Sequence, residues 1–315
     1  MAFEIPTIDY SGKIREISLG KGDKAVKVGG QTSYPFYLFE GEMPNEPKIA
    51  MEVFDYEPDD WADAAVEPFK DVLNDPAAWA KKNVNDYGAE LIALQLKSID
   101  PNGMNRSTDE AVSVAKSVID AVDVPVILWG VASAEKDTDV LRKISEECEG
   151  KNLIIGPVEE ADHKQIGAGA IAYKHTVIAS SPIDINLAKQ LNILLGNLGV
   201  PDNQILVDPT TGALGYGLEY TYSVMERDMM AALSQEDEKL QFPIICNVGI
   251  ETWKTKEAKL SIEEAPTLGD AKKRGIMIEC ITAMTMLLAG ASILILRHPE
   301  SVKLIKQMIN GLSTD

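Results

Sequence analysis

The chain has 315 residues, of which 45% are hydrophobic, and this is enough to bury a large core in one α/β domain. Its 49 acidic residues against 30 lysines and arginines give a formal net charge of −19, which disfavours nucleic acid and anionic membranes as partners. The first residues lack the basic start and apolar core of a signal peptide, and no apolar run approaches the ~20 residues of a membrane span, so we expect a cytoplasmic protein.

The first part of the chain, residues 1–47, is predicted to be an N-terminal extension to the main domain, 48–315. Two β-rich runs, 13–19 and 24–28, flank a glycine turn and predict a β-hairpin. The irregular connection that follows carries an aromatic cluster, which we expect to pack on the chain's own domain rather than on a partner. The members of this cluster are Tyr34, Phe36, Tyr37 and Phe39.

From Lys48 onward, short β-rich runs alternate with helical patterns. The predicted strands are 49–54, 91–96, 125–129, 153–155, 176–179, 205–207, 244–248 and 293–296. The helical patterns are 61–84, 108–122, 135–148, 161–171, 184–198, 218–233, 268–288 and 300–309, with Thr108 as a candidate N-cap. About eight strand–helix pairs predict a closed TIM (β/α)8 barrel, and an open, doubly wound sheet is the alternative.

The loop after the predicted strand 205–207 is the most distinctive stretch of the sequence. It combines a carboxylate, two hydroxyls and three glycines, at Asp208, Thr210, Thr211, Gly212, Gly215 and Gly217. The glycines allow a ligand to approach the backbone, so we expect bulk at Gly212 to impair binding and largely spare the fold. Asp208 precedes a proline, and this position suits a general acid or base equally with a residue that holds the turn by side-chain hydrogen bonds.

In a barrel, the loops at the carboxyl ends of the strands form the working face. This rule selects an acidic, hydroxyl-rich rim without a phosphate-binding glycine loop. The rim residues are Asp55, Ser98, Asp100, Trp129, Gly156, Pro157, Ser180, Ser181, Asp184, Asp208 to Gly215, Asn247, Glu251, Arg297 and His298.

Histidines and cysteines are too few and too scattered for a metal site or a nucleophilic triad. Of three histidines only His298 falls at the rim, where we interpret it as a capping or surface residue. The three cysteines are far apart and are expected to be reduced thiols. Lys97, at a strand end, is the one lysine that an aldolase-like barrel could use, and we rank that chemistry last.

Two further patterns concern apolar side chains. Trp129 and Trp253 offer flat surfaces that suit a planar macrocycle or a partner protein, although half-buried tryptophans are common in barrels. A helical stripe near the C-terminus is predicted to face the core. Its members are Met277, Ile281, Met284, Leu287 and Leu288.

Several segments resemble the small subunit of the corrinoid iron–sulfur protein, whose archaeal relative is the delta subunit of the acetyl-CoA decarbonylase/synthase complex. They are 208–219, 222–227, 243–249 and 251–257, together with 93–96 and 100–103. The resemblance implies a heterodimer with a large subunit that carries a [4Fe-4S] cluster and a mobile corrinoid-binding domain. It also implies that the corrinoid takes a methyl group from methyltetrahydrofolate through a separate methyltransferase and delivers it to acetyl-CoA synthase.

The same resemblance implies a non-catalytic role for this chain, which would present its strand-end loops to the corrinoid at the subunit interface. The sequence has three cysteines, one fewer than an all-thiolate [4Fe-4S] cluster requires, which agrees with a cluster on the large subunit. An alternative is a self-sufficient pterin-dependent corrinoid methyltransferase that uses Asp208, Asn247 and Asp184 for the pterin ring. The resemblance places these residues near the macrocycle: Trp129, Ser181, Asp184, Asp208, Thr210, Thr211, Gly212, Asn247 and Glu251.

Overall fold

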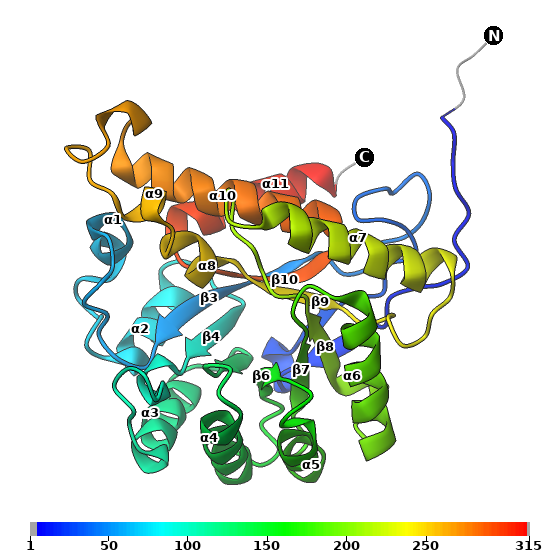
Figure 1. Cartoon of the computed structure of the whole chain (residues 1–315), viewed down its shortest axis with the longest axis horizontal. Coiled ribbons are helices and arrows are strands. Elements are labelled where there is room, and N and C mark those ends of the chain that lie inside the picture. Colours follow the sequence, from blue (N-terminus) through cyan, green and yellow to red (C-terminus); the bar gives the residue numbers. More distant parts are fainter. Residues whose placement is uncertain (1–4, 314–315) are drawn as a thin grey trace.

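A closed barrel of parallel strands forms the centre of the molecule, as the computed structural model shows for residues 5–313 (Figure 1). Around the barrel the strand order is β10-β3-β4-β5-β6-β7-β8-β9. The strands are β3 (Lys48–Phe54), β4 (Leu91–Gln95), β5 (Val126–Trp129), β6 (Ile154–Val158), β7 (Thr176–Ser180), β8 (Ile205–Asp208), β9 (Ile244–Asn247) and β10 (Ala291–Leu296). The predicted TIM barrel is confirmed, and the open-sheet alternative is wrong because β10 pairs with both β9 and β3.

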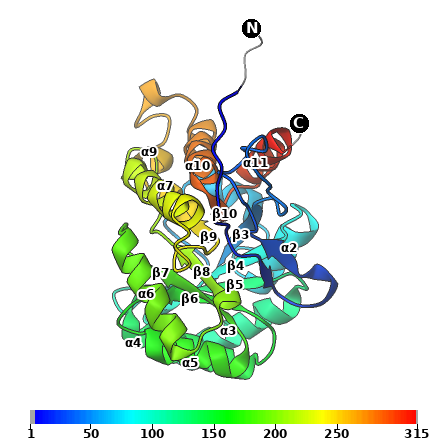
Figure 2. The same ribbon diagram turned by 90° about the vertical axis from the view of Figure 1, so that its right-hand side faces the viewer.

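Helices surround the barrel and cover the outward face of its strands (Figures 1 and 2). Leucine, isoleucine and valine side chains fill the layer between strands and helices, and a second cluster of smaller extent fills the barrel interior. The helices are α1 (Asp63–Val66), α2 (Pro76–Asn85), α3 (Thr108–Ala121), α4 (Ala134–Glu147), α5 (His163–Tyr173), α6 (Ile185–Leu198), α7 (Leu218–Ser234), α8 (Val248–Trp253), α9 (Lys256–Lys259), α10 (Ala271–Ala289) and α11 (Pro299–Leu312).

Local capping explains where several helices begin. The predicted N-cap Thr108 is wrong by one residue: Ser107 caps α3 in a capping box with Glu110, which satisfies backbone N–H groups at both positions. The loop predicted after β9 contains the short helices α8 and α9, and Asn247 is the residue before the first of them.

The predicted hairpin is present as β1 (Ile17–Leu19) paired antiparallel with β2 (Val26–Val28). It packs at the amino ends of the barrel strands, because Asn152, two residues before β6, donates to the carbonyl oxygens of Ser18 and Gly20. Ile17 and Leu19 are buried in the same cluster as the interior side chains of the barrel. The hairpin therefore closes the bottom and leaves the carboxyl-end mouth accessible.

The aromatic cluster of the extension divides between core and surface. Tyr34 packs beside Ile14 and Met229, and Phe36 contacts the main core. Tyr37 and Phe39 stack on each other and stay 49% and 54% exposed, so the expectation of packing on the same domain holds for half of the cluster.

The prediction that the α10 stripe faces the core is wrong for three of its five residues: Leu287 is buried, and the partly buried Met284 packs against the main core. Met277, Ile281 and Leu288 are 49%, 42% and 43% exposed. The other side of the helix, including Ala283, faces the barrel instead. Since α10 is apolar on both sides, its hydrophobic period alone does not show which side is buried.

Candidate functional site

Asp208 lies at the carboxyl end of β8, where the mouth of the barrel meets the glycine-rich loop. Its carboxylate accepts hydrogen bonds from Ser180 Oγ at 2.8 Å and from the backbone N–H of Thr210 at 3.0 Å. The side chain is 4% exposed, and burial is the main cause that raises the pKa of Asp208 to about 6. Both interpretations of Asp208 find support, because it holds the turn and is also a carboxyl group with a perturbed pKa in a cleft.

The loop after Asp208 is held by its own hydroxyl groups. Thr210 has a positive φ of 64° and donates from Oγ1 to the carbonyl oxygen of Ser181 at 2.8 Å. Thr221, at the start of α7, donates to the carbonyl oxygen of Thr210 and accepts from the N–H of Gly212, both at 2.8 Å. The buried Oγ1 of Thr211 has no hydrogen-bond partner among the described residues.

Gly212 is required by the packing of the loop itself. A Cβ at this position would lie 2.5 Å from the carbonyl carbon of Gly217. This distance is too short for a van der Waals contact, so the backbone of the loop would have to shift. Gly212 is buried and is not one of the residues that line the mouth cavity described below. A bulky residue here would therefore distort the loop, contrary to the expectation that the fold would be largely spared.

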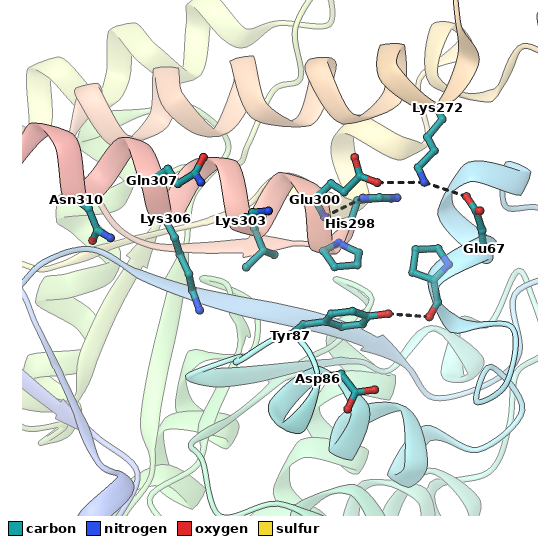
Figure 3. Close-up of a pocket in the computed structure, with 13 residues that line it drawn as sticks. Glu67, Asp86, Tyr87, Lys272, His298, Glu300, Lys303, Lys306, Gln307 and Asn310 are labelled. Atoms are coloured by element: carbon teal, nitrogen blue, oxygen red, sulfur yellow. Dashed lines mark hydrogen bonds and ion pairs between the residues drawn. The ribbon is translucent and has the colours of Figure 1, made fainter.

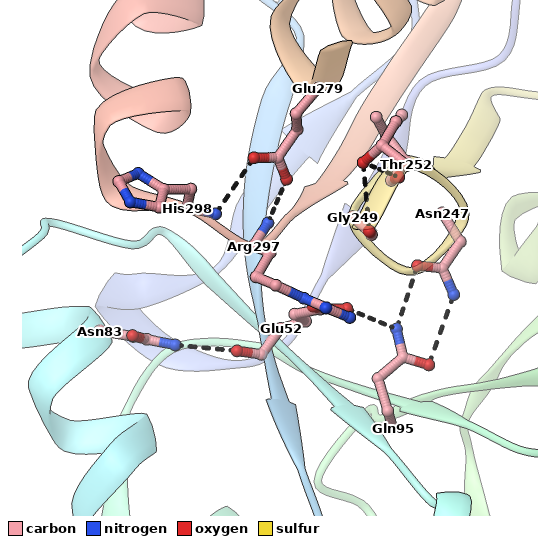
Figure 4. A network of polar contacts seen from close by, with 10 residues as sticks. Glu52, Asn83, Gln95, Asn247, Gly249, Thr252, Glu279, Arg297 and His298 are labelled. Carbon is pink, nitrogen blue, oxygen red and sulfur yellow. Dashed lines mark hydrogen bonds and ion pairs between the residues drawn. The ribbon is translucent and has the colours of Figure 1, made fainter. Parts of the chain in front are cut away.

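A buried polar network crosses the barrel next to this loop (Figure 4). Asn247 Oδ1 accepts from Gln95 Nε2 at 3.0 Å, and the same amide group reaches Glu52 Oε2 at 3.4 Å. Glu52 also forms an ion pair with Arg297, whose guanidinium lies 3.6 Å from the centre of the Trp61 ring. This network fixes the side chain of Asn247 at the edge of the mouth.

The mouth contains a cavity of about 240 Å³ that is lined by six of the nine residues predicted to lie near the macrocycle. These are Trp129, Asp208, Thr210, Thr211, Asn247 and Glu251. Ser181 lines a neighbouring depression together with Thr210. Asp184 is not in the cavity lining: it is the N-cap of α6 and accepts from the N–H groups of Asn186 and Leu187.

Lys97 is the main residue of the mouth that the predicted site omitted. It lines the 240 Å³ cavity and also an adjacent one of about 270 Å³ that contains Tyr56, Trp61 and Arg297. Burial lowers the pKa of Lys97, and the lysine forms no ion pair among the described residues. Its position two residues after the end of β4 was the available signal, and its chemistry is that of a partly desolvated ammonium group at the cavity wall.

A larger cavity than those of the mouth lies on the outer wall. It is a groove of about 760 Å³ beside α11, bordered by the Glu67–Lys272–Glu300 ion pairs and by Tyr87, whose hydroxyl donates to the carbonyl of Pro68 (Figure 3). His298 also lines it, buried to 1% exposure.

His298 is a capping residue, which confirms one of the two predicted roles and corrects the surface alternative. Its Nδ1 accepts from the N–H of Glu300 at the start of α11, and its own N–H donates to Glu279. Burial lowers the pKa of His298 to about 4, so the ring is neutral at physiological pH.

The side chains that commonly bind metals do not form clusters in the described part of the chain. The three cysteines are free and buried, and residues 5–313 contain no group of three or more His, Cys, Asp or Glu side chains that could hold a metal ion. Within the same residues, no helix has both the length and the apolar character that crossing a membrane requires.

Comparison with known proteins assigns the chain to a family. Residues 16–314 match the model of the CO dehydrogenase/acetyl-CoA synthase delta subunit. The chain belongs to this delta-subunit family. The delta subunit of the acetyl-CoA decarbonylase/synthase complex from Archaeoglobus fulgidus is 38% identical, over 98% of this chain and 71% of the relative. The corresponding subunit from Methanocaldococcus jannaschii is 34% identical, over 99% of this chain and 77% of the relative.

Solved structures place the delta-subunit barrel near dihydropteroate synthases. The enzyme from Xanthomonas albilineans, solved with 4-aminobenzoic acid, aligns with a TM-score of 0.59 and 12% identity, over 90% of this chain and 100% of the other. The enzyme from Thermus thermophilus aligns with a TM-score of 0.55 and 14% identity, over 89% and 98%. At such identities these likenesses concern the fold alone.

Proposed function

We propose that this delta-subunit family member is the small subunit of a corrinoid iron–sulfur protein, and that its barrel mouth covers the corrinoid held by a large subunit. The relatives of this family are named as subunits of the acetyl-CoA decarbonylase/synthase complex, which supports the existence of partner subunits for this chain. In this proposal the methyl group comes from methyltetrahydrofolate through a separate methyltransferase and goes to acetyl-CoA synthase. The [4Fe-4S] cluster belongs to the large subunit, and this chain has no catalytic activity alone.

The size of the mouth cavities is the observation that carries the proposal. Sites that bury a small organic ligand usually measure about 300–1,000 Å³. The two mouth cavities measure about 240 and 270 Å³, and Lys97 and Ile250 contribute to the walls of both. A mouth divided in this way suits a surface that covers part of a large ligand better than a pocket that encloses a whole folate.

The residues at the mouth fit a corrin ring. Trp129 contributes a small exposed part of its apolar ring at the end of β5, and the buried hydroxyl of Thr211, which has no partner among the described residues, is a hydrogen-bonding group of the kind that the amide side chains of a corrin require. Asn247 and Glu251 add polar groups on the opposite side of the same cavity. When bound by the large subunit, the corrinoid supplies the cobalt that carries the methyl group.

This chain's residues would orient the ring and exclude water from it. Trp129 is 8% exposed, so only a small part of its ring is left for a corrin to cover. Asp208 stays fixed by Ser180 and Thr210 in a buried position. A carboxyl with a pKa of about 6 is half protonated at pH 6, where it can donate a hydrogen bond to a carbonyl group, and it is a charged acceptor at higher pH.

A self-sufficient pterin-dependent corrinoid methyltransferase is the second candidate. The buried Asp208 and Asn247, at neighbouring strand ends and in the lining of one cavity, favour it. Asp184 is less suited to the pterin role that the sequence indicated, because its Oδ1 caps α6 by accepting from the N–H groups of Asn186 and Leu187 and the residue does not line the mouth cavity.

One experiment separates these functions. The purified chain is mixed with methyltetrahydrofolate and free cob(I)alamin, and the methylated product is followed spectrophotometrically with and without the large subunit and the methyltransferase. We expect no turnover by the chain alone and corrinoid methylation only in the reassembled system with the methyltransferase. Turnover by the chain alone, with folate binding that Asp208→Ala abolishes, would overturn the small-subunit proposal in favour of the enzyme.

A further inference from the structure

The groove of about 760 Å³ on the outer wall takes no part in the proposed function. It runs between α11 and the segment that follows α2 (Figure 3). Among the described residues, it shares no lining residue with the two mouth cavities. Its volume falls within the range of about 300–1,000 Å³ that is typical of sites for small organic ligands, and each of the two mouth cavities lies below that range. The groove is therefore a candidate for a separate binding site.

Carboxylate oxygens form one end of the groove. Lys272, at the start of α10, pairs with Glu67 Oε2 and with Glu300 Oε1, both at 3.1 Å. Each carboxylate uses one oxygen for the lysine, so its second oxygen can accept a hydrogen bond from a ligand. This end of the groove suits a group that carries N–H donors.

Ammonium and amide groups form the other end. Lys303, Lys306 and Gln307 line the groove from one side of α11, because residues three and four apart lie on the same side of a helix. Lys306 Nζ reaches across the groove and donates to the carbonyl oxygen of Gly88 at 2.6 Å, which leaves two further N–H donors (Figure 3). Lys303 is exposed and forms no ion pair with another described residue. This end suits an anionic group.

An aromatic ring lies between the two ends. Tyr87 is half-buried, and its hydroxyl donates to the carbonyl oxygen of Pro68 at 3.0 Å, which fixes the ring on the wall opposite α11 (Figure 3). Pro68, Pro299 and Val302 add apolar surface to the lining. A flat apolar surface of this kind suits the face of a heteroaromatic ring.

We infer that this groove binds a nucleoside monophosphate, with its base toward the Glu67–Lys272–Glu300 ion pairs and its phosphate toward Lys303 and Lys306. Acceptors, an aromatic surface and ammonium donors follow one another along the groove in the order that such a ligand requires. The helix rises ~9 Å from Glu300 to Lys306, so the two ends are far enough apart to hold different parts of one molecule.

The charges of the lining favour one phosphate over several. The groove has three lysines and three acidic residues, and Lys272 is shared by two of the acids. Two ammonium groups, on Lys303 and Lys306, remain for a phosphate monoester, which carries about −1.5 to −2 at pH 7. Asp86, beside Tyr87, can accept from ribose hydroxyl groups and would repel additional phosphates.

Calorimetric titration of the purified chain with adenosine monophosphate tests the inference. We expect saturable binding with a Kd below about 1 mM, the weak end of the range in which proteins use small metabolites. Adenosine lacks the phosphate and ribose 5-phosphate lacks the ring, so each should bind about tenfold more weakly. A chain that does not bind adenosine monophosphate, or that binds inorganic phosphate equally well, would overturn the inference.

Matched lysine variants locate the ligand. Lys303→Met removes an ammonium group from the groove, and Lys164→Met removes an exposed lysine of α5 that also forms no ion pair within the described residues. Loss of a charge-assisted hydrogen bond should raise the Kd for adenosine monophosphate about tenfold in Lys303→Met, and Lys164→Met should leave it unchanged. Tyr87→Leu should also weaken binding, whereas Tyr87→Phe keeps the ring and should bind nearly as wild type does.

The same titrations separate the groove from the mouth. Lys97→Met changes the mouth alone and should bind adenosine monophosphate as wild type does. Binding that Lys97→Met abolishes and Lys303→Met does not would place the ligand in the mouth, and the inference would be wrong. Equal effects of Lys303→Met and Lys164→Met would also overturn it. None of these results depends on the corrinoid proposal, because the titrations use neither the large subunit nor a corrinoid.

Discussion

Replacing Asp208 with asparagine should stabilise the protein at neutral pH and have little effect on stability near pH 4. Asparagine keeps an acceptor for the N–H of Thr210, and its amide can donate to Ser180 Oγ once that hydroxyl rotates. The substitution therefore preserves the hydrogen bonds of a buried site while removing a group that must ionise there. The expected change is a gain in the free energy of unfolding that depends on pH.

The magnitude follows from the pKa of Asp208. Burial raises it from 3.8 to about 6, so the folded protein binds a proton more tightly than the unfolded chain between these two values. Stability from this group is therefore highest below pH 4 and falls as the pH rises to 6. At about 1.4 kcal/mol per pKa unit the loss is about 3 kcal/mol, an upper limit that asparagine avoids. For a chain of this length that corresponds to about 4 °C in Tm.

The assay is urea unfolding of wild type and Asp208→Asn at several pH values from 4 to 7.5. The difference between the two proteins isolates Asp208 from other carboxyl groups that titrate in the same range. Ser180→Ala is the control, because loss of its hydrogen bond raises the pKa of Asp208 further and should extend the wild-type loss to higher pH. An Asp208→Asn variant that is less stable at every pH, or a difference that does not change with pH, would refute this reasoning.

Three other predictions concern the loop after β8, the buried ion pair of Arg297 and the metal content of the chain. Gly212→Val should lower the Tm because its side chain meets the backbone of Gly217, whereas Thr210→Ser keeps the donor to Ser181 and should be mild; a Tm equal to wild type for Gly212→Val would contradict the packing argument. Arg297→Met should cost about 3–5 kcal/mol in urea unfolding, since it leaves Glu52 buried without its cation, and Glu52→Gln in the same chain should recover most of that loss. The isolated chain should contain neither iron nor cobalt by elemental analysis, because its three cysteines are too few for an all-thiolate [4Fe-4S] cluster and the proposal assigns the corrinoid to the large subunit; stoichiometric iron with sulfide would contradict this.

The barrel could be predicted because its signals are local. Each strand is a short apolar run followed by a helical period, and eight such pairs favour a closed barrel, although only the pairing of β10 with β3 and β9 excludes an open sheet. The first residue of a helix was harder to predict where two good capping residues are adjacent. Ser107 and Thr108 both suit an N-cap, and only the spacing from Ser107 to Glu110 identifies the capping box that forms.

The mouth could be predicted in part for the same topological reason. The carboxyl ends of parallel strands meet at one rim, so residues as distant in sequence as Trp129 and Asn247 line one cavity. The pairing of Gln95 with Asn247 and of Glu52 with Arg297 could not be predicted, because it depends on which side chains point into the barrel at matching heights. The exposure of the α10 stripe could not be predicted, because apolar residues at helical spacing are typical of a subunit interface as well as of a core.

The structure of this chain bound to the corrinoid-loaded large subunit tests the central proposal most directly. The account predicts that the corrin ring lies over the mouth, with Trp129 and Thr211 within van der Waals distance of its edge or face and with the hairpin end of the barrel far from it. A corrin enclosed by the large subunit alone, or one placed against any other face of this barrel, would contradict the proposal.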